Sequence, residues 1–348
     1  MTDGNLPEPG TAATQPHRRR PRYAGKHPRK FEEKYKERDP GRYAGTVAKV
    51  MASGKTPAGM HRPIMVAEIL DALAPRPGET AADCTLGYGG HAREILARIQ
   101  PGGRLVGLDV DPIELPKTET RLRALGFDEK TFSAHHSNFA GLPKVISGAD
   151  MILADLGVSS MQFDDPARGF SMKANGPPDM RMNPNRGQPA SALLQKTGAD
   201  ALAELFAENA DEPHAQTIAA ALAGRAFDGT LALADAVRRA LPRLRDEERE
   251  LSVRRVFQAL RIAVNDEFSA LDTFLRNLPL CLNPGGRVAI LTFHSGEDRR
   301  VKKAFAAGLR DGVYCEISNE VIRPSAEERR DNPRSASAKL RWAKKGAA

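Results

Sequence analysis

The chain of 348 residues has no long uninterrupted apolar run, so no membrane-spanning helix is predicted. Its N-terminus lacks the basic-then-apolar layout of a signal peptide, and Asp3 and Glu8 argue against a transit peptide. Only three cysteines occur, Cys84, Cys281 and Cys315, and no two have the CxxC spacing of a zinc or redox motif. We therefore expect a cytoplasmic protein from a reducing compartment, with no metal site.

The formal net charge of +8 is concentrated at the two ends of the chain. Residues 1–42 hold 11 Lys/Arg against 6 Asp/Glu, residues 321–348 hold 8 against 3, and the remainder carries −2. Basic ends on a near-neutral body are typical of contact with a polyanion, most simply nucleic acid. For the N-terminal arm, a purely solubilising role is an equally open alternative.

The distribution of glycine, proline and apolar residues divides the chain into regions. Residues 1–58 are rich in Pro, Gly, Arg and Lys without an apolar period, and we predict a mostly disordered basic extension there. An amphipathic helix is expected just after His61. Apolar strands then alternate with helices, in "TAADCTL", "GRLVGLDV", "DMILADLGVSS" and "GGRVAILTF". This pattern predicts an α/β fold with a doubly wound, mostly parallel sheet, although Pro116 should break the helix after the second strand.

The alternation stops between the third and fourth of these strands. Residues 185–250 show only helical patterns, which predicts an inserted helical subdomain. We assign residues 166–251 to this insertion, and residues 59–165 and 252–348 to the sheet-containing domain. A single long helix over residues 253–278 is expected to lead back to the sheet.

Ligands of a doubly wound sheet bind at the carboxyl ends of its strands, so those ends are the candidate site. The first end offers "GYGGH" with Gly89, Gly90 and His91, which lacks the third glycine of a dinucleotide motif. Asp109 follows at the second end, about 20 residues on, where an acid binds ribose hydroxyls. A nucleoside without pyrophosphate points to S-adenosylmethionine, with Phe139 against adenine or simply in the core.

The third and fourth strand ends carry unusually many polar residues: Asp155, Ser159, Ser160 and Gln162 after the third, and His294 and Glu297 after the fourth. Such groups after buried strands need hydrogen-bond partners, and a ligand would supply them. The basic helix after His294 could face either RNA phosphates or solvent. Asp111, before Pro112, has a local explanation as a helix cap.

Several stretches together resemble a known family, the bacterial 16S rRNA cytosine N4-methyltransferases of the MraW type. The matching stretches are "TLGYGGHAREIL", "GLDVDP", "ILADLGVSSMQFDDPARGFSM", "GPPDMRMNPNRGQPA", "RVFQALRIAVNDE", "TFHSGEDRRVKK" and "NPRSASAKLR". The resemblance implies a Rossmann-like class I methyltransferase fold with a helical insertion. It also implies S-adenosylmethionine as cofactor and, as substrate, a cytidine in the decoding region of 16S rRNA within the small ribosomal subunit. Monomer and homodimer both remain open.

The resemblance further implies roles for single residues. The cofactor-binding positions are Gly89, Gly90, His91, Asp109, Phe139, Asp155 and Gln162. Because the family supplies no agreed catalytic residue, we hypothesise that Asp155 accepts a hydrogen bond from the cytosine amine. Ser159 and Ser160 would orient the ring, and His294 with Glu297 would complete the pocket.

Two further features bear on the chemistry. No cysteine lies in the polar loop after the third strand, so methylation of a cytosine amine fits better than C5 methylation, which needs a thiolate. The chain also departs from the family at Pro178, Asn183, Gly296, Pro116 and the "ADE" of residues 210–212, and its basic extension has no counterpart in the typical member. Rival hypotheses are another RNA or DNA group as substrate and a noncatalytic ribosome-binding homologue. A nicotinamide oxidoreductase is disfavoured.

Overall fold

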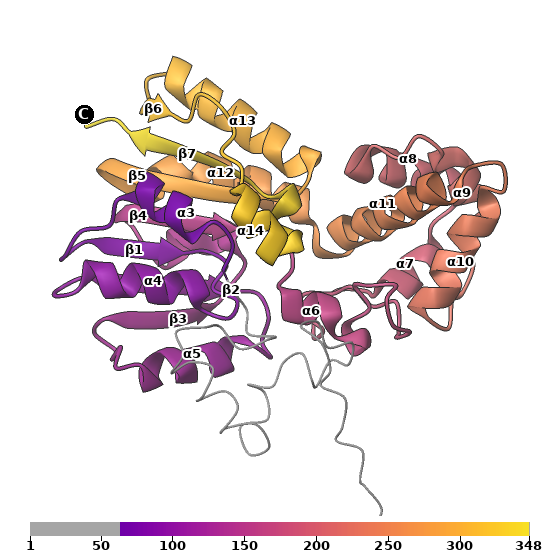
Figure 1. Cartoon of the computed structure of the whole chain (residues 1–348), viewed down its shortest axis with the longest axis horizontal. Helices are drawn as coiled ribbons and strands as arrows, with labels where there is room; N and C mark the ends of the chain where they lie inside the picture. The colour runs from indigo at the N-terminus through magenta and orange to yellow at the C-terminus, as the bar shows by residue number, and fades with distance from the viewer. Residues whose placement is uncertain (1–62, 348) are drawn as a thin grey trace, which may run out of the picture. The chain divides into compact units, whose positions relative to one another are not determined.

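The computed structural model describes residues 63–347, so the extension predicted over residues 1–58 lies outside the described residues. Within the described part, seven strands form one sheet in the order β3-β2-β1-β4-β5-β7-β6 (Figure 1). Strands β1 to β5 run parallel, and β7 pairs antiparallel with both β5 and β6. The strands are β1 (Thr80–Asp83), β2 (Arg104–Asp109), β3 (Phe132–His136), β4 (Ala149–Asp155), β5 (Leu282–Thr292), β6 (Tyr314–Ile317) and β7 (Lys339–Lys345).

The sheet confirms the four strands predicted from their apolar runs and adds three that the sequence did not reveal. The predicted ones are β1, β2, β4 and β5, which form the buried centre of the sheet. The others lie toward its edges and carry polar residues, with only Phe132 fully buried in β3 and only Tyr314 in β6. Strands that bury one side chain in four or five lack the apolar run on which the prediction rested.

Helices cover both faces of the sheet, as a doubly wound fold requires. On β4, Met151 and Leu153 pack with α3 (Val66–Leu73), α4 (Gly90–Ile99) and α5 (Leu115–Ala124) on one face. Their neighbours Ile152 and Ala154 face the other side. There they pack with the 3-10 segment η2 (Phe139–Lys144), α12 (Glu267–Cys281) and α13 (Ser295–Arg310). Alternation of side chains along each strand therefore builds two apolar cores, and the predicted fold class is confirmed.

The proline expected to interrupt the helix after β2 does not disturb it. Helix α5 begins at Leu115, and Pro116 occupies its first turn, where the missing N–H needs no helical partner. The preceding residues form the turn instead, with the Asp111 carboxylate accepting from the backbone N–H of Ile113 at 2.8 Å.

The region between β4 and β5 contains a separate group of helices that extends away from the sheet (Figure 1). After short turns at α6 (Ser160–Asp164) and η3 (Pro166–Arg168), five helices follow: α7 (Ala190–Lys196), α8 (Ala199–Ala210), α9 (Ala215–Leu222), α10 (Thr230–Ala240) and α11 (Asp246–Asn265). Their apolar faces form a third core, distinct from the two on the sheet, that runs from Phe170 to Leu260.

The long helix expected over residues 253–278 is two helices, and this prediction was wrong. The chain breaks between α11 and α12 at Asp266, whose φ of 50° lies in the left-handed region. The predicted single apolar face is divided accordingly. Val256 and Leu260 pack in the insertion core, and Leu271 packs under the sheet. A helical period continues across one left-handed residue, so the pattern alone does not show the break.

The C-terminal part of the chain returns to the strand-end edge of the sheet. Helix α14 (Ala326–Asp331) and the segment η4 (Pro333–Ser337) precede β7, and a Glu328 carboxylate oxygen accepts from the Met65 N–H at 2.8 Å. Among residues 63–347, no helix combines the length and apolar character needed to cross a membrane.

Candidate active site

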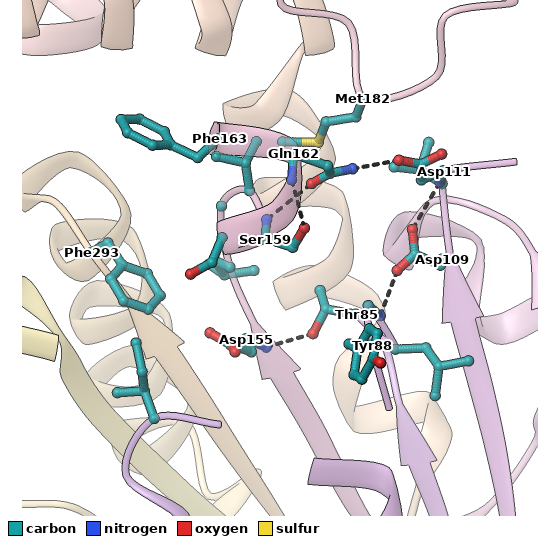
Figure 2. A pocket seen from close by; sticks show the side chains of 18 of the residues that line it. Thr85, Tyr88, Asp109, Asp111, Asp155, Ser159, Gln162, Phe163, Met182 and Phe293 are labelled. Carbon is teal, nitrogen blue, oxygen red and sulfur yellow. Dashed lines mark hydrogen bonds between the residues drawn. The ribbon is translucent and has the colours of Figure 1, made fainter. Parts of the chain in front are cut away.

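A cavity of about 580 Å³ opens at the carboxyl ends of the parallel strands, between the sheet and the helical insertion. This volume lies within the range of small-molecule sites, roughly 300–1,000 Å³. Figure 2 shows the polar side chains that converge on it from the loop after β1, the ends of β2 and β4, and the loop after β4. Of the predicted site residues, the lining includes Gly90, His91, Asp109, Phe139, Asp155, Ser159, Ser160, Gln162 and Glu297.

The glycines after β1 bring backbone close to neighbouring elements. Gly89 has a φ of 79°, and a Cβ there would lie 2.9 Å from Thr118 of α5. A Cβ on Gly90 would lie 2.8 Å from Pro63. Gly89 therefore allows the turn to pack against α5, whereas Gly90 and His91 lie on the cavity side.

Asp109, at the end of β2, joins the glycine turn to the turn that follows β2. One carboxylate oxygen accepts from Gly87 N–H at 2.7 Å and the other from Asp111 N–H at 2.8 Å (Figure 2). Burial raises the pKa of Asp109, partly offset by these backbone hydrogen bonds. A carboxylate fixed in this way at the second strand end can accept hydrogen bonds from a ribose diol.

Asp155 ends β4 at the centre of the cavity, where its backbone N–H donates to Thr85 Oγ1 at 2.6 Å. Its carboxylate lies 3.5 Å from His91 Nε2, a buried atom that forms no hydrogen bond within the described part of the chain. Asp83 lies beneath them, and burial raises its pKa to about 6 despite the nearby His91. The strand ends thus bring together three ionisable groups, of which Asp83 and His91 are buried and Asp155 faces the cavity.

The loop after β4 is held by a reciprocal helix cap. Ser159 Oγ accepts from the Gln162 N–H at 3.2 Å, and Gln162 Oε1 accepts from the Ser159 N–H at 2.9 Å. Gln162 Nε2 then donates to Asp111 at 2.7 Å. The side chains of Ser159 and Gln162 therefore shape the cavity wall, and Ser160 begins the short helix beside them.

His294 and Glu297 belong to a charged cluster that also includes two residues the sequence analysis did not select. His294 Nε2 lies 3.2 Å from Glu297, and Arg261 contacts Glu267 through two hydrogen bonds of 2.8 Å. Burial raises the pKa of Glu297, but His294 and Arg261 outweigh that effect and hold it below the usual range. His294 itself caps α13, with Nδ1 accepting from the Glu297 N–H at 3.4 Å.

Glu267, His294 and Glu297 place three potential metal-ligand atoms within 4.8 Å of one another. The Arg261 guanidinium already supplies the positive charge there, because both carboxylates raise its pKa against the opposing effect of burial. We therefore interpret Glu267, His294 and Glu297 as ion-pair and hydrogen-bond partners around Arg261 and not as a metal site. Arg261 falls within the stretch "RVFQALRIAVNDE", where a basic residue in an apolar helix was the available signal.

Other cavity residues also escaped the sequence analysis. Arg254 on α11, Met182 on the insertion and Arg334 on η4 all contribute to the wall. Arg334 forms an ion pair with Asp164 of α6 and therefore joins the C-terminal segment to the loop after β4. None of the three lies at a strand end, which is where the sequence argument looked for site residues.

The departures from the family pattern have local structural explanations. A Cβ on Gly296 would lie 2.6 Å from the ring of Phe268, over which Arg300 stacks at 3.7 Å, so this ring fills the space beside Gly296. Asn183 is buried and lies 3.4 Å from His136 Nε2, and its Oδ1 accepts from Asn185 N–H at 3.0 Å.

At the remaining departures in the insertion, the side chains or the backbone form hydrogen bonds with neighbouring helices. Asp211 contacts Ser295 and Arg299 of α13, at 3.2 and 3.0 Å. Glu212 is buried and accepts from Ser252 Oγ at 3.0 Å. Pro178 is buried, and its carbonyl accepts from the Ser191 N–H at 2.9 Å.

The cavity fits S-adenosylmethionine on three observations. The Asp109 carboxylate is positioned for a ribose diol, and Phe139, packed edge-on against Phe274 at 5.4 Å, offers an aromatic surface to the same cavity. Glycine backbone lines the wall without a dinucleotide motif. The buried His91 Nε2 and the Asp155 carboxylate leave polar atoms available to a ligand.

Comparison with known proteins gives consistent results. Residues 58–346 match the family model described as the MraW methylase family. "Ribosomal RNA small subunit methyltransferase H 1" of Lachnoclostridium phytofermentans is 49% identical, over 94% of this chain and 93% of its own length. "Ribosomal RNA small subunit methyltransferase H 2" of Alkaliphilus metalliredigens is 50% identical, over 93% and 97%. "Ribosomal RNA small subunit methyltransferase H" of Crocosphaera subtropica is 41% identical, over 83% and 90%.

These coverages bear on the basic extension, for which no counterpart is expected in the typical family member. A match over 94% of 348 residues leaves only about 21 unmatched, so the first relative must share most of residues 1–58. The relative from Crocosphaera, at 83% coverage, need not. The extension therefore has counterparts in some relatives. With the matched family model, these identities and this strand order, the chain belongs to the MraW methylase family, and S-adenosylmethionine is its cofactor.

Proposed function

We propose that this protein transfers a methyl group to N4 of a cytidine in the decoding region of small-subunit (16S) rRNA. The observation that carries the proposal is the Asp155 carboxylate at the end of β4, inside the cavity. Among the described residues it has no hydrogen-bond donor, and only His91 lies within ion-pair distance. The names of the relatives at 49% and 50% identity support an rRNA substrate.

The chemistry needs an oriented amine and an acceptor for its proton. S-adenosylmethionine supplies an activated methyl group, so much of the acceleration comes from orientation of the amine. The Asp155 carboxylate would accept a hydrogen bond from the amine N–H and then receive the proton. Ser160 would contact the base from the adjacent wall, and the Arg261–Glu297–His294 cluster would hold the far wall rigid.

The cavity disfavours the nearest rival reaction. Methylation at cytosine C5 requires a cysteine thiolate that adds to the ring. Cys84 is the cysteine in the cavity lining, it is 2% exposed, and burial raises the pKa of its thiol. A thiol that resists ionisation is a poor nucleophile, so amine methylation is favoured.

Nucleic acid would approach from the side of the helical insertion. Arg254 of α11 lines the cavity and is exposed, and its Nε donates to the Glu250 carbonyl at 3.2 Å. Among the described residues, no carboxylate lies within ion-pair distance of its guanidinium. We propose that the Arg254 guanidinium binds an RNA phosphate next to the target nucleotide. The protein would then act in the cytoplasm, on the small ribosomal subunit.

The test is product identification. Small subunits from cells that lack the homologous enzyme are incubated with the protein and labelled S-adenosylmethionine, and the digested nucleosides are identified by mass spectrometry. We expect labelled N4-methylcytidine. Label in another nucleoside would refute the assignment of the substrate atom. An absence of cofactor binding in calorimetry would instead favour a noncatalytic ribosome-binding protein.

A further inference from the structure

A chain of hydrogen bonds connects the ribose acid at the end of β2 with the wall of the cavity formed by the insertion. It begins at Asp109, which accepts from the Asp111 N–H at 2.8 Å. The Asp111 side chain continues it, because one carboxylate oxygen accepts from Gln162 at 2.7 Å and from Arg168 Nη1 at 2.8 Å (Figure 2 shows the Asp109–Asp111–Gln162 part). Its other oxygen caps the turn before α5.

Arg168 extends the chain into the insertion. Its Nη2 donates to the carbonyls of Arg181 and Met182, at 3.1 and 2.8 Å. Asn265, at the end of α11, holds the same segment from the other side, accepting from the Met182 N–H at 2.7 Å and donating to the Met180 carbonyl at 2.8 Å. Two residues therefore hold the backbone around Met182: Arg168, where the chain enters the insertion, and Asn265, where it leaves.

Burial makes this connection stiff. Asp111 is 1% exposed, and the Arg168 side chain is 11% exposed. A carboxylate buried to this extent cannot exchange its donors for water, so loss of Arg168 leaves an uncompensated charge and loss of Gln162 leaves a missing hydrogen bond. A cap for the turn before α5 needs only the oxygen that bonds Ile113, whereas the second oxygen serves the cavity wall.

We propose that Asp111 is a positioning residue that couples the cofactor and RNA sides of the cavity. Occupancy of the ribose site at Asp109 stabilises the loop after β4 and the Met182 segment, and so strengthens RNA binding. The inference rests on the proposed function for the identity of the RNA. Coupling of this kind is reciprocal, so RNA also strengthens cofactor binding.

The test measures coupling and uses S-adenosylhomocysteine as the cofactor probe. Affinity for small ribosomal subunits is measured with and without it, and hydrogen exchange of residues 156–182 is followed in its presence and absence. In the wild type we expect an approximately tenfold tighter complex with small subunits and slower exchange of this segment. In Asp111→Asn we expect bound S-adenosylhomocysteine to give less than about twofold coupling and no slowing of exchange.

Two further variants keep the test decisive. Arg168→Gln leaves the Asp111 cap intact and should reproduce the loss of coupling, even if Asp111→Asn does not fold. Asp150→Asn is the matched control, because Asp150 accepts from Thr80 N–H and Asn283 at the opposite end of β4, and it should retain wild-type coupling. A wild type without coupling, or Asp111 and Arg168 variants that retain it, would overturn the proposal. The exchange arm needs no RNA, so it still judges Asp111 if the proposed substrate is wrong.

Discussion

The sheet and the helical insertion differ in where they collect polar groups. In the sheet domain, the buried acids Asp83, Asp111, Glu114 and Glu297 and the buried His91 lie at or just beyond the carboxyl ends of strands, whereas the buried Arg341 lies within β7. Helices α7 to α11 form a core of alanine and larger apolar side chains, and the buried acid of this region, Glu212, lies in the turn between α8 and α9. Parallel strands end at one common edge, so groups far apart in sequence converge there. Packed helices have no such edge, and the insertion contributes walls rather than reacting groups.

The largest effect is expected from a change of Asp155, the acid that the end of β4 brings into the cavity. Asp155→Asn keeps the shape of the side chain but cannot take up the amine proton. We expect kcat for methyl transfer to fall about 10³-fold, measured with labelled S-adenosylmethionine and small subunits. Circular dichroism serves as the folding control, and calorimetry with S-adenosylhomocysteine measures cofactor affinity. Full turnover together with unchanged cofactor affinity would eliminate Asp155 from the mechanism.

The separate cores predict different responses to the same truncation. Phe206→Ala in the insertion and Phe305→Ala in the sheet domain each remove a fully buried ring and should cost about 3–5 kcal/mol of unfolding free energy. We expect Phe206→Ala to speed hydrogen exchange in α7–α11 while affinity for S-adenosylhomocysteine stays near wild type. Faster exchange in β1, β2 and β4 of that variant would show that the two regions unfold together.

The buried acid at the end of β1 predicts a pH dependence of stability. Asp83 has a pKa of about 6 in the folded protein, against 3.8 for an ordinary aspartate, so the native state binds more protons between these values. This residue should therefore lower the stability of the cofactor-free protein by roughly 3 kcal/mol as pH rises from about 4 to 6. Carboxylates such as Glu297, whose pKa is held low, make the opposite contribution.

Asp83→Asn removes that titration, and its unfolding free energy at pH 7 should exceed that of the wild type. Denaturant unfolding at a series of pH values measures the slope. Some slope should persist, because burial also raises the pKa of Asp109. A variant slope equal to that of the wild type would contradict the assignment to Asp83.

The smallest expected effect concerns the insertion wall. Arg254→Gln should raise KM for small subunits about fivefold, with kcat within about twofold, and lower the salt dependence of RNA binding by about one phosphate contact. Arg225→Gln is a matched control, because Arg225 is also exposed on the insertion and donates to a backbone carbonyl, that of Ala221. Equal effects of the two variants would remove the special role of Arg254.

Strong local patterns made the centre of the fold predictable from the sequence. The four apolar strands and the helices of the insertion follow from runs and periods of side chains, and Asp109 and Asp155 follow from their places at strand ends. Strands β3 and β6 bury one residue each, β7 intersperses its buried apolar residues with lysine and arginine, and the break at Asp266 is a single backbone torsion. The roles of Asp111, Arg168 and Arg261 depend on partners more than five residues away, which spacing along the chain does not reveal.

The cavity wall built from Arg334 and its neighbours has a consequence for the order of folding. Its lining extends from Pro63 to Ser337, and the bond between Met65 and Glu328 joins residues 263 positions apart. Contacts of such long sequence separation form slowly, and the site exists only once they have formed. A bound cofactor should therefore act mainly on the lifetime of the finished protein, since a partly folded chain has no complete pocket in which to hold it.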